Sequence, residues 1–103
     1  MLTQEEIEKI AETIKTKIKP DKIYLFGSYA LGKATNLSDL DILVVDDSPR
    51  DKKSLALEIS KSLFPRNYGL DLLVTSSEEL KGKSRLNFWR AITAGGKKLY
   101  ERN

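Results

Sequence analysis

The chain has 103 residues, 40% of them hydrophobic, and a formal net charge of +3, which excludes a disordered chain and predicts one globular domain over residues 1–103. It contains neither Cys nor His, so disulfides, thiolate zinc sites and a histidine base are excluded, and any catalysis must use carboxylates and bound metal. No stretch approaches the ~18 apolar residues of a membrane span and the N-terminus does not resemble a leader, so we expect a cytoplasmic protein without membrane contact.

The first half of the chain predicts a helix followed by two strands. Thr3 and Glu6 form a capping-box pattern ahead of an amphipathic helix that ends near the first proline. Residues 22–26 form a β-branched and aromatic run, typical of a strand, which leads into a Gly-Ser turn. A polar loop covers residues 32–38, and residues 39–45 predict a second, largely apolar strand.

The second half predicts helices around a third strand. Ser48 and the proline after it predict the N-cap and first residue of a helix. Residues 70–74 predict the third strand, and a short helical segment follows it. Trp89 lies at helical spacing among apolar residues, and residues 97–101 predict a final short strand. The order of elements predicts an α/β (or α+β) domain with a small mixed sheet covered by helices.

Three aspartates on the predicted strands are the strongest candidate site residues. Asp39 and Asp41 open the second strand, where alternation places both side chains on one face. Asp71 repeats this arrangement in the third strand, so three carboxylates converge if the two strands are neighbours. An all-oxygen site of this kind fits Mg²⁺ or Mn²⁺, which would relieve the repulsion. The alternative for each aspartate alone is a strand end that simply faces solvent.

A resemblance to a known family joins these residues to the Gly-Ser turn. The turn alone is more typical of an ordinary chain reversal, although its N–H groups could hold phosphate oxygens. The run from Gly27 to Val45 reads GSYALGKATNLSDLDILVV. It resembles the signature of the smallest members of the DNA polymerase beta-like nucleotidyltransferase superfamily. The resemblance extends from the leading helix to the Gly-Gly-x-x-Leu-Tyr ending and implies that superfamily's fold.

The resemblance implies a nucleotide-binding role for several residues. Gly27 and Ser28 would bind the triphosphate of ATP, with Ser38 as a further hydroxyl near it. The superfamily pattern commonly has an arginine three residues after the motif serine, and this chain has Leu31 there. Lys33 is close enough in sequence to supply a positive charge, but not a bidentate ligand.

The resemblance also implies a catalytic role for the acids. Asp39 and Asp41 would bind the metal, and Asp71 would complete that site and help to deprotonate the attacking hydroxyl. An acceptor hydroxyl would then attack the α-phosphorus in line, and pyrophosphate would leave. Such chemistry depends on positioning and electrostatics, so it needs no histidine.

Minimal members of the superfamily are often antitoxins whose partners are HEPN-domain ribonuclease toxins, which they are thought to adenylylate. The leading hypothesis is therefore AMPylation of a hydroxyl side chain, such as that of a tyrosine, on a HEPN toxin. A non-catalytic binding module and transfer to a small hydroxyl compound are the alternatives. Trp89 and residues 81–85 are candidate partner contacts. Direct nucleic-acid binding is not expected, because the aromatic residues do not interleave with the lysines. The sequence does not decide whether the chain forms a homo-oligomer.

Overall fold

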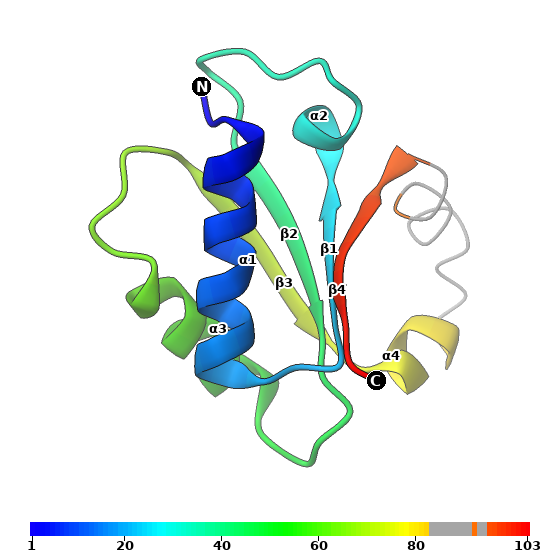
Figure 1. Cartoon of the computed structure of the whole chain (residues 1–103). Coiled ribbons are helices and arrows are strands. Elements are labelled where there is room, and N and C mark those ends of the chain that lie inside the picture. The colour runs from blue at the N-terminus through cyan, green and yellow to red at the C-terminus, as the bar shows by residue number, and fades with distance from the viewer. Residues whose placement is uncertain (83–91, 93–94) are drawn as a thin grey trace.

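The described part of the chain contains one four-stranded sheet and four helices. The computed structural model describes residues 1–82, 92 and 95–103, arranged as Figure 1 shows. The strands are β1 (Lys22–Phe26), β2 (Leu40–Val45), β3 (Leu70–Thr75) and β4 (Lys97–Glu101). The helices are α1 (Gln4–Ile18), α2 (Gly27–Ala30), α3 (Lys52–Ser62) and α4 (Ser77–Gly82).

The sheet is mixed, with the strand order β3-β2-β1-β4. β1 lies antiparallel to both β2 and β4, whereas β2 and β3 run parallel. Parallel neighbours need a crossover connection, and α3 supplies it between β2 and β3. The predicted small mixed sheet covered by helices is therefore confirmed.

β2 is buried on both faces of the sheet. Leu40, Ile42 and Val44 pack in the main core with residues of α1 and α3, which lie over one face in Figure 1. Leu43 and Val45 pack in a second cluster that includes a residue of α4. Burial on both sides holds this strand, and the residues at its start, in a fixed place.

α1 begins and ends as its sequence predicts. The hydroxyl of Thr3 accepts a hydrogen bond from the Glu6 N–H at 3.1 Å, and the Glu6 carboxylate accepts one from the Thr3 N–H at 2.9 Å. Lys19 closes the helix in a left-handed conformation, with its N–H donating to the Lys15 carbonyl. These caps satisfy backbone groups that the helix ends leave without partners.

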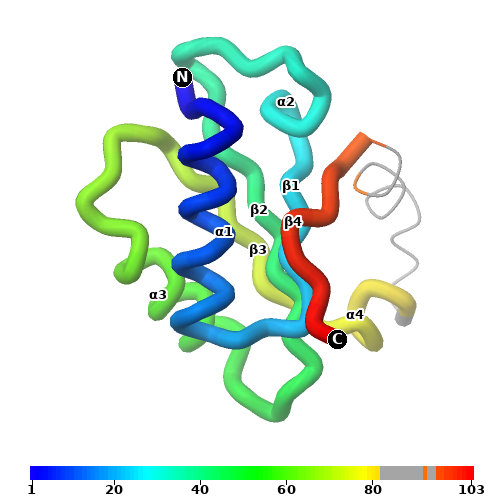
Figure 2. The backbone as a smooth tube through the Cα atoms, viewed as in Figure 1, coloured from blue at the N-terminus to red at the C-terminus, as the bar shows by residue number. Residues whose placement is uncertain are grey.

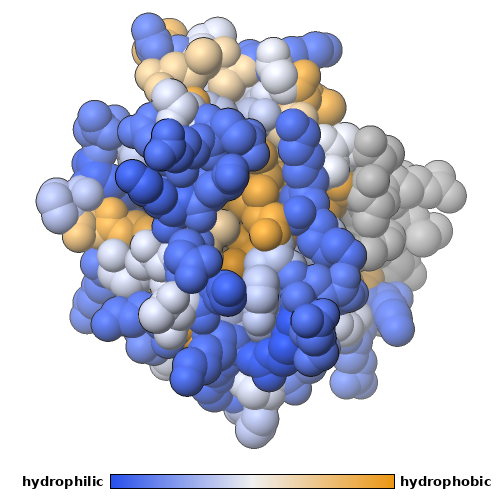
Figure 3. Space-filling view, in the orientation of Figure 1, coloured by the Kyte–Doolittle hydropathy of each residue, from blue (hydrophilic) through white to orange (hydrophobic). Residues whose placement is uncertain are grey.

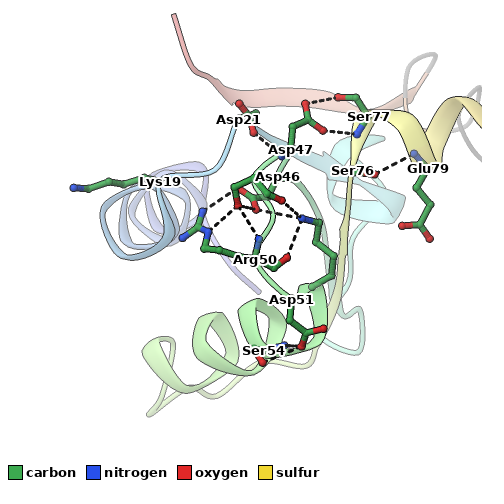
Figure 4. A network of polar contacts seen from close by, with 12 residues as sticks. Lys19, Asp21, Asp46, Asp47, Arg50, Asp51, Ser54, Ser76, Ser77 and Glu79 are labelled. Atoms are coloured by element: carbon green, nitrogen blue, oxygen red, sulfur yellow. Dashed lines mark hydrogen bonds and ion pairs between the residues drawn. The ribbon is translucent and has the colours of Figure 1, made fainter.

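The start of α3 differs from the prediction, because Ser48 is not its N-cap. The helix begins at Lys52, and the carboxylate of Asp51 caps it by accepting from the Ser54 N–H at 2.9 Å. Ser48 instead donates its hydroxyl to the carboxylate of Asp46 at 2.5 Å. Asp46 is only 1% exposed, and Figure 4 shows side chains of the following loop turned toward it. The donors turn toward Asp46 because a buried carboxylate requires hydrogen-bond partners, and the helix starts only after this loop.

The C-terminal strand at residues 97–101 is confirmed, whereas the predicted helix around Trp89 lies outside the described residues.

Figure 3 shows hydrophilic residues over the outer faces of α1 and β4, with apolar atoms between them. Ala11, Leu99 and Tyr100 line a small pocket there. Within the described ranges, no helix has the length and apolar character needed to cross a membrane.

Candidate active site

One edge of the sheet brings together the ends of three strands. β1 ends where β2 and β3 begin, because β1 runs opposite to both. The connections at this edge hold Gly27 after β1, Asp39 before β2 and Gly69 before β3. In Figure 2, the connection from α2 to β2 arches over this edge beside the N-terminal end of α1. The candidate catalytic, metal-binding and nucleotide-binding residues found in the sequence all belong to this edge or to its connections.

Asp41 and Asp71 are direct partners in the parallel ladder of β2 and β3. Their carboxylates therefore lie side by side, as the sequence predicts for neighbouring strands. Burial raises the pKa of Asp41 from its ordinary value of 3.8 to about 6, and the charge of Asp71 and a hydrogen bond with its side chain add to the rise. The charge of Asp39 acts in the same direction. Two carboxylates placed in this way either share a proton or attract a cation.

Two glycines leave the space that the carboxylates occupy. A Cβ atom on Gly27 would lie 2.0 Å from Oδ2 of Asp41, and one on Gly69 would lie 1.9 Å from Oδ1 of Asp39. Gly27 also has a φ of 72°, in the left-handed region that favours glycine. Gly69 was not among the predicted site residues, although its place directly before the third strand is a signal in the sequence.

The sequence predicted that the second strand begins at Asp39, but in the structure Asp39 lies one residue before the strand. β2 begins at Leu40, whose N–H donates to the carbonyl of Gly69 at 2.8 Å. Among the described residues, no group of three or more potential metal-ligating side chains is already placed to hold an ion. Asp41 and Asp71 meet directly, and the charge of the exposed Asp39, at the end of the loop, acts on Asp41.

The Gly-Ser turn directly follows β1, as predicted, and forms the short helix α2. α2 begins at Gly27, and the N–H of Leu31 donates to the Gly27 carbonyl. The Lys33 N–H donates to the Ser28 carbonyl at 2.9 Å, which keeps Lys33 close to the turn. Ser28 is half-buried, whereas Leu31 is 56% exposed. The turn therefore presents a leucine to solvent where the superfamily pattern has an arginine.

Ser38 is held in a tight turn just before Asp39. Its hydroxyl oxygen accepts from the Thr35 N–H at 2.9 Å, and its own N–H donates to the Thr35 carbonyl at 3.1 Å. The same turn is bonded through the Leu37 N–H to the Thr35 hydroxyl at 3.2 Å. These contacts fix the approach of the chain to the first acid.

Comparison with known proteins identifies relatives of this arrangement. Residues 8–103 match the family described as "Polymerase beta, Nucleotidyltransferase". A protein of Methanocaldococcus jannaschii, named "Putative protein adenylyltransferase MJ0604", is 33% identical over 104 residues. That match spans 97% of this chain and 100% of the relative.

Two solved structures share the fold over most of this chain. One is a toxin–antitoxin complex with AMP-PNP, with a TM-score of 0.64, 28% identity, and coverage of 92% of this chain and 73% of the other. The second is a tri-AMPylated Shewanella oneidensis HEPN toxin in complex with an MNT antitoxin, with a TM-score of 0.60 and 27% identity. It covers 97% of this chain and 74% of the matched chain.

Proposed function

The chain belongs to the polymerase beta nucleotidyltransferase family, and we propose that it transfers AMP from ATP to a hydroxyl group of a partner protein. The observation that carries this proposal is the pairing of Asp41 with Asp71, beside a glycine turn that follows β1. The name of the M. jannaschii relative and the AMPylated toxin complex support AMP as the transferred group and a protein as its acceptor. The partner that we propose is a HEPN-domain toxin, with this chain as its antitoxin.

The acids of the site fit Mg²⁺ or Mn²⁺. Their ligand atoms are all oxygens, which these hard cations prefer. Burial raises the pKa of Asp41 most, and the like charges of Asp71 and Asp39 raise it further; a cation would relieve this repulsion. We propose that Asp39, Asp41 and Asp71 hold the metal, which when bound neutralises the charge that develops on the phosphates.

Each residue of the turn has a proposed part in holding ATP. Gly27 and Ser28 would bind the triphosphate through backbone N–H groups and the serine hydroxyl. Lys33 would add a positive charge, because its backbone is bonded to Ser28. Ser38 would offer a further hydroxyl on the other side of the connection, where its turn with Thr35 fixes it.

The proposed reaction needs a proton acceptor as well as a bound nucleotide. The acceptor oxygen bonds to the α-phosphorus of ATP while the bond to pyrophosphate breaks, so the hydroxyl proton must be taken up. Asp71 is exposed and lies beside Asp41, so its carboxylate can take this proton. Placement of the reacting oxygen close to phosphorus supplies much of the rate.

Transfer is tested by incubating the protein with ATP, Mg²⁺ and the product of the neighbouring gene, and following the partner by mass spectrometry. The expected result is one or more AMP groups on the partner, abolished by EDTA. Modification of glycerol or other small hydroxyl compounds without the partner would indicate the small-molecule alternative instead.

Leu31 favours a second candidate function, a non-catalytic binding module. An exposed leucine stands at the position of the usual arginine, so one charged ligand for the phosphates is absent. A tight complex with the partner and no AMP transfer would support this second function.

A further inference from the structure

The two outer strands of the sheet, β3 and β4, differ in how well they are protected against pairing with another chain. Free strand edges are usually protected by lysines, prolines or bulges. β4 reads KKLYE, with Lys98 paired to Glu101, and its register with β1 shifts within the ladder. β3 reads LDLLVT and stays in register with β2 from end to end. The sequence of β3 therefore has none of these protective features, and its only charge is that of Asp71.

The backbone of β3 has a free side, opposite to β2. The carbonyls of Gly69 and Thr75 accept hydrogen bonds at 2.8 Å from N–H groups at the start of β2 and just after its end. Successive residues of a strand alternate in the side to which they bond. The N–H and C=O groups of Leu70, Leu72 and Val74 therefore point toward the free edge. Within the described ranges, no strand pairs with this edge.

The side chains of β3 are less covered than those of β2 on both faces of the sheet. On the face under α1 and α3, Ile42 is 0% exposed, whereas its register partner Leu72 is only half-buried. On the face that carries Asp41 and Asp71, which we call the acid face, Leu43 is 1% exposed and its partner Leu73 is 39% exposed. A further strand beside β3 would thus bury apolar surface on both faces.

The free edge of β3 runs directly past Asp71, the proposed proton acceptor. Asp71 and Leu73 direct their backbone groups toward β2, so an antiparallel strand at the free edge would face each of them in a non-hydrogen-bonded pair. Cα atoms in such pairs are ~4.5 Å apart, and the two side chains share one face of the sheet. A hydroxyl residue opposite Asp71 would therefore lie on the acid face beside that carboxylate. The residue two positions before it would lie opposite Leu73.

We propose that the acceptor segment of the partner protein pairs as an antiparallel strand with the free edge of β3. The acceptor residue lies opposite Asp71, and an apolar residue two positions before it lies opposite Leu73. The inference rests on the proposed function and adds to it how the acceptor is recognised. Backbone hydrogen bonds to Leu72 and Val74 hold the segment. The hydroxyl proton passes to Asp71 as the oxygen bonds to phosphorus and the bond to pyrophosphate breaks.

Amide hydrogen exchange of the isotope-labelled full chain, followed by NMR without nucleotide, tests the pairing. When the neighbouring-gene product binds, the amides of Leu72 and Val74 should exchange at least about tenfold more slowly. The amides of Asp71 and Leu73 face β2 and should change less. Uniform slowing along β3, or no slowing, would overturn the pairing. Slowing that needs no partner and grows with the concentration of the chain would identify a second copy as the occupant, and would also overturn the inference.

Matched variants separate the side-chain contact from the backbone contact. Leu73→Ala should raise KM for the partner about fivefold and change kcat less than about twofold. Leu57→Ala should change neither, because this exposed leucine lies two residues from the buried residues of α3, on the side away from the sheet.

Val74→Pro removes one N–H at an edge where proline is tolerated, whereas Val74→Ala keeps it. The proline variant should bind the partner about fivefold more weakly than the alanine variant. Equal effects of a variant and its control would contradict the proposal.

An exchange of charge across the proposed pair tests its register. Mass spectrometry of the modified partner locates the acceptor residue. Leu73→Glu should raise KM for the partner about tenfold, because it replaces an apolar contact with a charge. A lysine two positions before the acceptor residue should recover at least about threefold of this loss, and a lysine two positions after it should not. Recovery from the later position alone would overturn the antiparallel pairing.

Pairing and transfer can fail separately. AMP on the partner without slower exchange at Leu72 and Val74 would overturn the inference and leave the proposed function intact. Slower exchange at both amides without AMP on the partner would contradict the proposed function, while confirming that the free edge of β3 binds a strand of the partner.

Discussion

The carboxylate of Asp41 occupies the space that a side chain at Gly27 would need, since a Cβ there would lie 2.0 Å from Oδ2. Gly27 also has a positive φ of 72°. Gly27→Ala should therefore strain the backbone and displace the acid, lowering the free energy of unfolding by more than ~1 kcal/mol and abolishing Mg-ATP binding. Urea denaturation and calorimetry measure the two effects.

Gly32 provides the control, because it has nearly the same φ, 71°, and nothing within 4 Å of its hypothetical Cβ. Gly32→Ala should cost only the backbone strain, about 1–2 kcal/mol, and should keep Mg-ATP binding. Equal loss of binding in both variants would show that the contact with Asp41 is unimportant.

Asp41→Asn should have opposite effects with and without nucleotide. In EDTA at pH 7 the variant should be more stable than the wild type, because an amide beside Asp71 removes one of two like charges. Mg-ATP at a hundred times its dissociation constant should stabilise the wild type by about 2.7 kcal/mol and the variant hardly at all. Thermal denaturation checks both, and a similar shift of the two proteins with Mg-ATP would count against the metal site.

Asp46 should be important for stability rather than for activity. It is 1% exposed and accepts hydrogen bonds from Arg50 at 2.9 Å and Lys52 at 3.4 Å. Asp46→Asn should lower the free energy of unfolding by about 2 kcal/mol, less than for a fully buried pair because Arg50 is 42% exposed. Asp51→Asn should change it by a few tenths of a kcal/mol only, since asparagine also caps helices well. A denaturation series that ranks the two variants equally would contradict this.

The contribution of Asp46 should disappear in acid. Burial raises its pKa, but hydrogen bonds from Ser48, Arg50 and Lys52 outweigh burial and leave the pKa below its ordinary value of 3.8. A lowered carboxylate pKa stabilises the fold above the unfolded-state pKa, and this stability is lost as pH falls below it. The stability difference between wild type and Asp46→Asn should therefore be constant near pH 7 and shrink below about pH 4. A stability difference that grows on acidification would show that folding raises the pKa of Asp46 instead of lowering it.

Leu31→Arg should strengthen nucleotide binding by about tenfold, because a guanidinium beside Ser28 would add a charge-assisted hydrogen bond to the phosphates. Leu31 is 56% exposed, and Leu57 of α3 is 57% exposed, so Leu57→Arg controls for the added charge. Calorimetry measures the dissociation constant of Mg-ATP for the two variants and the wild type. If the two variants bind equally, the phosphates do not lie where the turn suggests.

The sequence predicted the strands and the face on which each aspartate lies, because apolar runs and a fixed two-residue alternation are local properties. It predicted that Asp41 and Asp71 would converge only if their strands were neighbours, and the parallel ladder of β2 and β3 meets that condition. It did not predict the start of α3, because the capping choice between Ser48 and Asp51 depends on the burial of Asp46. It also placed Asp39 within the strand and omitted Gly69, since their close approach depends on two segments far apart in the chain.

The cleft between the start of α1 and the connections before β2 and β3 illustrates the same limit. Its walls come from the start of α1 and from two connections, and no local pattern relates Glu6 to Tyr68. Only the parallel pairing of β2 and β3 brings the two connections together.

The most direct test of metal-dependent AMP transfer is the initial rate at which AMP appears on the partner protein, measured by mass spectrometry for matched carboxylate-to-amide variants. With Mg-ATP and the neighbouring-gene product, we expect Asp39→Asn and Asp71→Asn to lower the rate at least about a hundredfold, and Asp51→Asn to leave it unchanged. Wild-type rates in the first two variants, or a stable complex in which the wild type adds no AMP, would contradict the account.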